Sequence, residues 1–283
     1  MLSDAIVTLS CPDQPGIVAT VAAALAQRGG DIRVSQQFGD DQTGQFFMRV
    51  HVQVPAALTL ADLRAHLEPV ADAFGMTWAV TDSAERPAVL LMASREGHCL
   101  NDLLYRWSTG WLPVEITAIV SNHETLRPLV ERYGVPYHHV PVTPESREQA
   151  ETRLLELVDS NAVDTVILAR YMQIVSERVC SALAGRLINI HHSFLPGFSG
   201  AGPYRQAHER GVKLIGATAH YVTVDLDEGP IIEQDTVRVE HSLGPQELAA
   251  VGRDVECQVL ARAVRWHAER RVFVNGPRTV IFR

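Results

Sequence analysis

The sequence predicts an α/β protein with two domains, a small α+β domain followed by a larger doubly wound domain with a mostly parallel sheet. The chain has 283 residues, which is enough for two ordinary domains with separate cores. Over residues 5–81 the apolar periods follow the order βαββαβ. From residue 88 onward, short apolar runs alternate with amphipathic segments, as in a sheet covered by helices on both faces.

In the small domain, the spacing of apolar residues predicts each element. Ile17, Val21 and Leu25 recur every four residues, which indicates a helix with one buried face. Apolar and polar residues alternate over 48–54, so one face of that strand is buried. The other expected elements are strands at 5–10, 31–38 and 76–81 and a helix over 60–74.

The βαββαβ order is ferredoxin-like, and the stretch TLSCPDQPGI at residues 8–17 resembles the first strand and turn of an ACT domain. ACT domains commonly bind amino acids and pair with further copies. The resemblance therefore implies an amino-acid effector site at Asp13, Gly16 and Ile17, where a helix start offers free N–H groups to a carboxylate. Two alternatives stay open: Gly16 only starts the helix, or the domain only assembles a homo-oligomer.

A short polar linker at 83–87 separates residues 1–82 from the larger domain, which we assign to residues 88–283. We expect strands at 88–93, 114–121 and 164–169 and a short segment at 137–142. We expect one helix around 100–107, a second that ends at 133, and a third over 145–159. In such sheets, ligands bind at the carboxyl ends of the strands. The loop over 94–102 has no GxGxxG or GxxxxGK[ST] spacing, so we interpret it as the start of a helix.

Composition excludes several classes of partner. The chain has 25 Lys+Arg against 33 Asp+Glu and a net charge of −8, with no basic run, so we expect no nucleic-acid partner. Its 4 cysteines form no CxxC pair, which argues against a disulfide framework or a thiolate zinc site and favours a cytoplasmic location. No apolar run approaches the roughly 18 residues of a membrane span, and no signal peptide is recognisable.

Candidate catalytic residues follow the later strands. Asn189 and His191 are two residues apart in the strand beginning at Leu187, so both project from the same face. His220 ends a further strand that runs into an acidic loop containing Asp227. An amide, an imidazole and a carboxylate are the groups needed to polarise a carbonyl and move a proton at neutral pH.

Two other interpretations of these histidines compete with catalysis. The pair His191-His192 could be structural. Metal binding by His191, His192, His220 and two aspartates is the second interpretation. However, adjacent histidines in a strand face opposite ways and no H-E-x-x-H is present, so we expect no metal site.

The run Asn189-Ile190-His191, followed by SFLP at 193–196 and then by His220 and Asp227, resembles the signature of the formyltransferase fold that handles 10-formyltetrahydrofolate. With an ACT domain ahead of it, the chain resembles the formyltetrahydrofolate deformylases. The resemblance implies that Asn189, His191 and Asp227 are catalytic, with support from His220 and Ser193. It further implies a folate pocket formed by Met172, Gln173, Ile174, Val175, Val222, Thr223 and Asp225. Gly202 departs from the pattern, because the family often has a basic residue there.

The resemblance also names a reaction, the hydrolysis of 10-formyltetrahydrofolate to tetrahydrofolate and formate. The formyl group sits on an aniline-type nitrogen, so it is more electrophilic than a peptide carbonyl, and we expect neither a metal nor another cofactor. Asn189 and protonated His191 would donate hydrogen bonds to the developing oxyanion. Asp227 would stabilise the imidazolium, orient or deprotonate water, and return a proton to the leaving nitrogen.

Two alternative functions stay open. The same three groups would serve a folate-dependent formyltransferase of the glycinamide ribonucleotide transformylase type. A ribonucleotide acceptor would require a phosphate site built from glycine-rich loop amides, and the loop at 97–99 is poor in glycine, which favours hydrolysis. The third possibility is a catalytically inactive protein that senses amino acids through its ACT domain.

Overall fold

A computed structural model describes residues 2–197 and 203–283 of the chain. The chain divides into two compact units. The first comprises Met1–Glu85 together with Glu269–Arg283, and the second comprises Arg86–Ala268.

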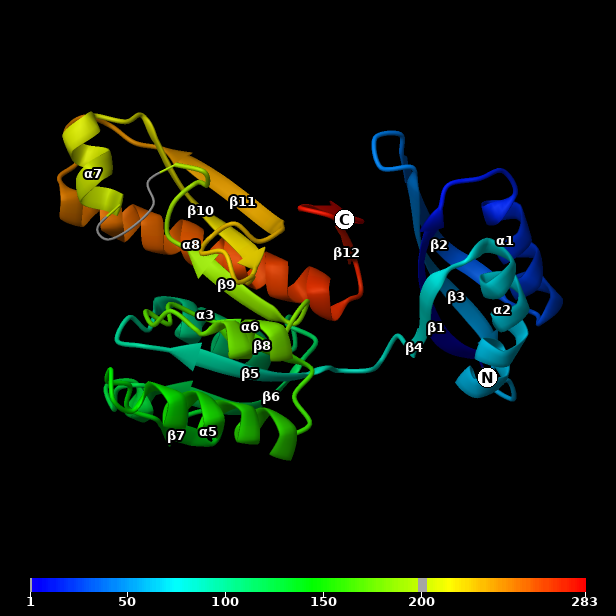
Figure 1. Cartoon of the computed structure of the whole chain (residues 1–283), viewed down its shortest axis with the longest axis horizontal. Coiled ribbons are helices and arrows are strands. Elements are labelled where there is room, and N and C mark those ends of the chain that lie inside the picture. The colour runs from blue at the N-terminus through cyan, green and yellow to red at the C-terminus, as the bar shows by residue number, and fades with distance from the viewer. Residues whose placement is uncertain (1, 198–202) are drawn as a thin grey trace. The chain divides into compact units, whose positions relative to one another are not determined.

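The first unit has the predicted βαββαβ order (Figure 1). Its strands are β1 (Leu2–Pro12), β2 (Asp31–Asp40), β3 (Gln45–Pro55) and β4 (Thr77–Asp82), and its helices are α1 (Ile17–Gln27) and α2 (Leu60–Phe74). The strands form an antiparallel sheet in the order β2-β3-β1-β4. Ile17, Val21 and Leu25 of α1 are buried against the sheet, as their spacing predicts.

The last fifteen residues, Glu269–Arg283, belong to the first unit, whereas we expected them in the larger domain. They form the hairpin of β12 (Val272–Asn275) and β13 (Arg278–Ile281). The reason is the face of β3 that carries Phe47 and Arg49, which are 2% and 5% exposed. Phe273 packs edge-on against Phe47 with ring centroids 5.8 Å apart, and the guanidinium of Arg49 donates to the carbonyl of Glu269 at 3.0 and 3.2 Å.

The second unit is built on a seven-stranded sheet in the order β11-β10-β9-β8-β5-β6-β7. The five strands from β5 to β9 run parallel to one another, whereas β10 is antiparallel to both of its neighbours, β9 and β11, which agrees with the predicted mostly parallel sheet. The strands are β5 (Ala88–Ala93), β6 (Glu115–Ser121), β7 (Tyr137–His139), β8 (Thr165–Leu168), β9 (Leu187–His191), β10 (Leu214–Tyr221) and β11 (Ile231–Arg238).

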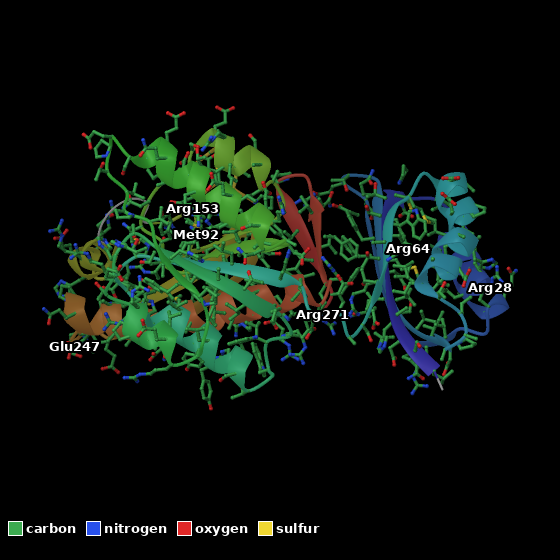
Figure 2. The ribbon with its side chains drawn as sticks, turned by 90° about the horizontal axis from the view of Figure 1, so that it is seen from below. Arg28, Arg64, Met92, Arg153, Glu247 and Arg271 are labelled. Carbon is green, nitrogen blue, oxygen red and sulfur yellow. The ribbon has the colours of Figure 1, made fainter. Side chains whose placement is uncertain are left out.

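Helices cover both faces of this sheet, as Figure 1 shows. They are α3 (His98–Ser108), α4 (Arg127–Glu131), α5 (Arg147–Ser160), α6 (Glu177–Ala182), α7 (Pro203–Arg210) and α8 (Pro245–Ala268). Met92 of β5 is 2% exposed and packs in the layer beneath α5, the helix that carries Arg153 (Figure 2). Among the described residues no helix is long and apolar enough to cross a membrane, not even the 24-residue α8.

The strand order reverses between β5 and β8, because the chain leaves β5 toward β6 and β7 and later returns to β5 on its other side. The two carboxyl ends are tied together at this point. The backbone N–H of Ser94 donates to the carbonyl of Arg170 at 3.2 Å, and the N–H of Met172 donates to the Ser94 hydroxyl at 2.9 Å. A reversal of this kind opens a crevice where α/β proteins bind ligands.

The hairpin contacts predict a local stability effect. Asn275 is 6% exposed and donates to the carboxylate of Asp40 at 2.6 Å. We expect Asn275→Ala to lower the opening free energy of the hairpin amides by about 1–3 kcal/mol, because a buried carboxylate oxygen loses one of its two donors and keeps only Arg278. Native-state hydrogen exchange of the β12 and β13 amides measures this loss. Val274→Ala, at the exposed neighbouring position, is the control and should change little; equal effects of both substitutions would contradict the assignment.

Candidate active site

Four polar side chains meet at the ends of β9 and β10. The Nδ1 atom of His191 lies 3.2 Å from the Asp227 carboxylate, and the Nε2 atom of His220 lies 3.7 Å from the other carboxylate oxygen. The Nδ2 atom of Asn189 lies 3.2 Å from the same Nε2 atom of His220. The structure therefore brings together all three predicted catalytic residues and one of the two predicted supporting residues.

The loop geometry explains how Asp227 reaches both histidines. Asp227 has φ 59°, a left-handed conformation that aspartate tolerates better than most residues. Gly229 lies so close to β10 that a Cβ there would be 1.8 Å from the carbonyl oxygen of Tyr221. A β-bulge between Ala219 and His220 shifts the register of β10 at the same place. The DEGP sequence thus folds the acidic loop tightly back onto the strand.

The hydrogen bond from His191 and the neighbouring ring of His220 hold the pKa of Asp227 well below its usual range, against the opposing effect of burial. Asp227 is therefore a carboxylate at neutral pH. The other ring nitrogen of His191, Nε2, is buried and has no hydrogen-bond partner within the described part of the chain. It is the atom of this ring that is available to a ligand.

His220 orients the amide of Asn189. Its Nδ1 atom lies 2.8 Å from the carbonyl oxygen of Tyr221, an acceptor, so Nδ1 carries a proton. In the neutral ring Nε2 is then an acceptor, which receives one N–H of the Asn189 amide. The second N–H of that amide stays available for a ligand in the same cavity.

These residues line a cavity of about 370 Å³, which we call the histidine cavity. Its wall includes six of the seven residues expected to bind folate, and Asp225 is the exception. The six are Met172, Gln173, Ile174, Val175, Val222 and Thr223. The first four follow β8 and the other two follow β10, which is antiparallel to β9, so segments that leave the sheet in opposite directions form the cavity wall.

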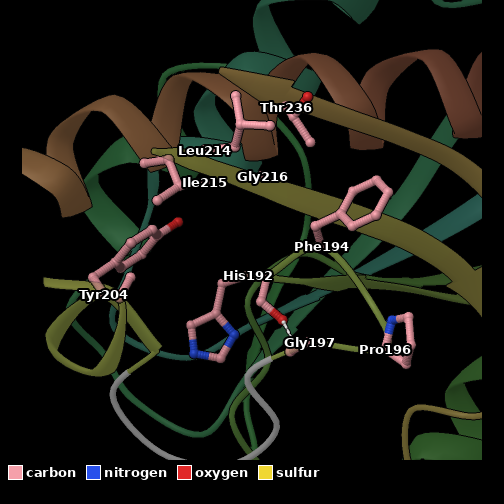
Figure 3. Close-up of a pocket in the computed structure, with 11 residues that line it drawn as sticks. His192, Phe194, Pro196, Gly197, Tyr204, Leu214, Ile215, Gly216 and Thr236 are labelled. Atoms are coloured by element: carbon pink, nitrogen blue, oxygen red, sulfur yellow. Dashed lines mark hydrogen bonds between the residues drawn. The ribbon is translucent and has the colours of Figure 1, made fainter. Parts of the chain in front are cut away.

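A second cavity, of about 430 Å³, lies beside the end of β9 and is lined mainly by apolar groups, among them Phe194 and Ile215 (Figure 3). We call it the Phe194 cavity. Ser193 lines this cavity and not the histidine cavity, and its hydroxyl donates to the carbonyl of Gly197 at 2.7 Å. Its contacts hold the turn after β9. Gly202 lies outside the described residues.

The expected opposite orientation of His191 and His192 is wrong. Their rings are in edge-on contact with centroids 5.3 Å apart, because β9 ends at His191 and the alternation of a strand does not extend to His192. His192 lines both cavities. Burial, together with the nearby positive charge of Arg170, lowers the pKa of His192 to about 4, so this ring is neutral at neutral pH.

A buried carboxylate that the sequence interpretation missed lies beneath this site. Glu256 of α8 is 0% exposed and accepts hydrogen bonds from His98 Nε2 at 2.7 Å and from the Tyr204 hydroxyl at 2.5 Å. The Nε atom of Arg170 lies 3.4 Å from the same carboxylate. Burial alone would raise the pKa of Glu256, but the His98 hydrogen bond, the Arg170 charge and the Tyr204 hydrogen bond outweigh burial and lower that pKa.

Metal-ligand geometry occurs once among residues 2–197 and 203–283, at His98, Cys99 and Glu256, whose ligand atoms lie within 4.8 Å of one another. The carboxylate there is already engaged by an imidazole, a phenol and a guanidinium. Burial raises the pKa of the Cys99 thiol, which disfavours the thiolate form that binds metals. These observations identify the group as an ion-pair cluster.

The three expected effector residues in the first unit differ in accessibility. Gly16 has φ 95° with open space where a Cβ would lie, so its backbone is approachable at the start of α1. The side chain of Ile17 is 2% exposed and part of the core, so only its backbone is available to a ligand. Asp13 lies against Gly39 of β2, where a Cβ would be 2.6 Å from the carboxylate.

The burial of His192 predicts a lowered pKa for its imidazole. We expect this ring to stay neutral at about pH 5, well below the ordinary histidine midpoint near 6.5. Carbon-13 NMR of labelled histidine measures the midpoint, and the signal absent from His192→Gln identifies the ring. Substitution of Arg170 by Gln should raise the midpoint, because it removes a neighbouring positive charge. An ordinary midpoint in the unmodified protein would contradict the described burial.

Comparisons with known proteins agree with this architecture. The Formyl transferase family matches residues 88–264, and the ACT domain family matches residues 5–67. The formyltetrahydrofolate deformylase of Corynebacterium sp. (strain P-1) is 48% identical over 279 residues, which cover 98% of each chain. A solved deformylase structure from Burkholderia mallei superimposes with a TM-score of 0.95 at 51% identity, covering 99% of this chain and 100% of that one.

A more distant similarity is confined to part of the chain. Glycinamide ribonucleotide transformylase 1 from Symbiobacterium toebii is 32% identical with a TM-score of 0.66, covering 70% of this chain and 95% of that one. The relatives at 48% and 51% identity are deformylases, and the matched regions cover 98% and 99% of this chain. Because their similarity extends over both units, the chain belongs to the formyltetrahydrofolate deformylase family of enzymes.

Proposed function

We propose that the histidine cavity hydrolyses 10-formyltetrahydrofolate to tetrahydrofolate and formate, with Asn189, His191 and Asp227 as its catalytic residues. The observation that carries this proposal is the shared carboxylate of Asp227, which lies 3.2 Å from His191 and 3.7 Å from His220. The pair Asp227–His191 leaves Nε2 of the imidazole available, and His220 leaves one Asn189 N–H available. His191 Nε2 and this Asn189 N–H can both donate to the carbonyl oxygen of a bound formyl group.

In the first step the oxygen of a water molecule bonds to the formyl carbon, and the carbonyl oxygen becomes negative. The Asn189 amide and the His191 imidazolium donate hydrogen bonds to that oxygen. Asp227 stabilises the imidazolium through Nδ1. Removal of one such donor typically slows acyl transfer by about a hundredfold or more.

Asp227 has a second role in proton movement. Because its pKa is well below the usual range, the carboxylate is a weak base in the resting site. It therefore orients the attacking water first and accepts a proton only as the new C–O bond makes that water acidic. The same proton then passes to the leaving nitrogen as the C–N bond breaks, which gives tetrahydrofolate and formate.

The folate would occupy the histidine cavity, whose volume of about 370 Å³ lies within the usual range for small-molecule sites. The segment from Met172 to Val175 forms one wall and Val222 and Thr223 form the other. Met172 and Ile174 are exposed apolar side chains at 53% and 63%, which is what a pterin or aminobenzoyl ring would cover.

We also propose that the ACT unit binds an amino-acid effector at the start of α1, and that it assembles the protein into a homo-oligomer. The backbone at Gly16 and Ile17 provides unpaired N–H groups for a carboxylate. Glycine and methionine are the candidate effectors, because both report the state of one-carbon metabolism. An enzyme that empties the formyl-folate pool needs such control.

Incubation of the purified full chain with 10-formyltetrahydrofolate and no added acceptor tests hydrolysis. We expect equal amounts of formate and tetrahydrofolate. Asp227→Asn should lower this rate by about a hundredfold to ten-thousandfold, because it removes the proton acceptor and the charge that stabilises His191. Tetrahydrofolate binding, measured by calorimetry, should remain close to that of the unmodified chain.

Asp225→Asn is the matched control, because Asp225 is in the same loop but does not line the cavity. Formate release that requires an added amine would instead identify a formyltransferase. No reaction combined with tight amino-acid binding would identify a sensor. If Asp227→Asn lost folate binding and turnover equally, the catalytic assignment of Asp227 would be wrong.

Effector binding is tested by Gly16→Ala, which adds a Cβ where φ is 95°. We expect hydrolysis to lose its response to glycine or methionine, because the ligand can no longer approach the backbone. Gly75→Ala strains a second left-handed position in the same unit, at the end of α2, and should keep the response. Equal responses in both variants would refute the site. Light scattering on the same samples reports the oligomeric state.

A further inference from the structure

Arg170 lies in the segment that follows β8 and lines the same cavity as His191. Leu168, the last residue of β8, pairs with Asn189 of β9, so this segment leaves β8 beside the strand that carries His191. Neighbouring strands are about 4.8 Å apart. Arg170 lies where the strand order reverses between β5 and β8, has φ 65°, and lines the histidine cavity.

The guanidinium of Arg170 is buried but keeps unused donors. Its side chain is 12% exposed, and its Nε atom lies 3.4 Å from the Glu256 carboxylate. Apart from that ion pair, it has no hydrogen-bond partner among residues 2–197 and 203–283. An arginine has five N–H donors in a planar fork. Most of this donor capacity therefore remains available to a ligand.

Glu256 compensates the positive charge of Arg170 without using all the N–H donors of its guanidinium. One of its oxygens accepts from the Tyr204 hydroxyl and the other accepts from His98, so the carboxylate does not form a two-pronged pair with Arg170. A buried guanidinium without any counter-ion would be strongly disfavoured. Glu256 is thus a positioning residue, which allows Arg170 to lie at the cavity wall with its terminal nitrogens unengaged.

We propose that Arg170 forms a carboxylate subsite in the histidine cavity that receives the formate released by hydrolysis. This inference rests on the proposed function, because only hydrolysis makes formate at this place. The formyl group of the substrate is neutral, whereas formate has two equivalent oxygens and a full negative charge. A planar guanidinium matches such a pair of oxygens with two parallel hydrogen bonds.

The neighbouring groups leave Arg170 as the fixed positive charge on this wall. His192 borders the same cavity and is neutral. Asp227 is occupied by His191 and His220, so it does not compete for the guanidinium. Formate formed beside Asn189 and His191 therefore has a cationic group within the same cavity, on the side of β8.

The test measures binding of carbon-13 formate to the full chain by NMR line broadening, without turnover. We expect Arg170→Gln to weaken formate binding by about tenfold or more, because hydrogen bonds to a charged donor are lost. Arg170→Lys keeps the positive charge but lacks the planar pair of N–H donors, so it should weaken formate binding by less than Arg170→Gln does. Arg153→Gln removes an exposed positive charge from the same unit and should leave binding unchanged.

Controls separate this inference from the proposed function. Asp227→Asn should bind formate but not hydrolyse substrate, and chloride at equal ionic strength should not displace formate. Unchanged formate affinity in Arg170→Gln would overturn the subsite, as would formate binding no tighter than chloride in the unmodified chain. Arg170-dependent formate binding in a chain that releases no formate from 10-formyltetrahydrofolate would uphold the subsite and defeat the hydrolysis.

Removal of Arg170 leaves Glu256 buried without its cation, so folding needs its own check. The double substitution Arg170→Gln, Glu256→Gln removes both charges together, and circular dichroism reports whether each variant is folded. A folded double variant that still bound formate as tightly as the unmodified chain would equally overturn the subsite.

Discussion

The carboxylate of Asp227 between two histidines is the interaction on which the site depends. It fixes the ring of His191 through Nδ1 and lies near His220, whose opposite nitrogen is held by the backbone of Tyr221. These contacts fix the orientation of both imidazole rings. The loop that supplies Asp227 is held by the close approach of Gly229 to β10, so a backbone constraint determines where the charge lies.

A second buried carboxylate organises the scaffold around that site. Glu256, in the middle of α8, connects three segments that are far apart in sequence: the start of α3, the loop after β8 and helix α7. Gly252, one turn earlier in α8, leaves room for the ring of Tyr204, since a Cβ there would lie 2.1 Å from the Tyr204 hydroxyl. The two carboxylates therefore have different structural roles: Asp227 orients the histidines of the cavity, and Glu256 connects the segments around it.

Much of this arrangement was predictable because local sequence determines it. The period of Ile17, Val21 and Leu25 predicts α1, and the two-residue spacing of Asn189 and His191 predicts a shared direction from β9. The segments after β8 and β10 that were expected to bind folate follow from the family resemblance, and six of their seven residues line the cavity. Asp225 does not line it.

Other features depend on partners that no local pattern encodes. In the sequence, Glu256 looks like an ordinary charged residue of a helix. Its burial depends on His98, Tyr204 and Arg170, which come from other segments and surround it only in the folded chain. The β12–β13 hairpin contacts a strand more than two hundred residues earlier through side chains, as in the hydrogen bond from Asn275 to Asp40. That hairpin makes the first unit discontinuous in the chain. During synthesis the second unit can therefore be completed before the first, in whose sheet Phe47 stays uncovered until the hairpin with Phe273 has been made.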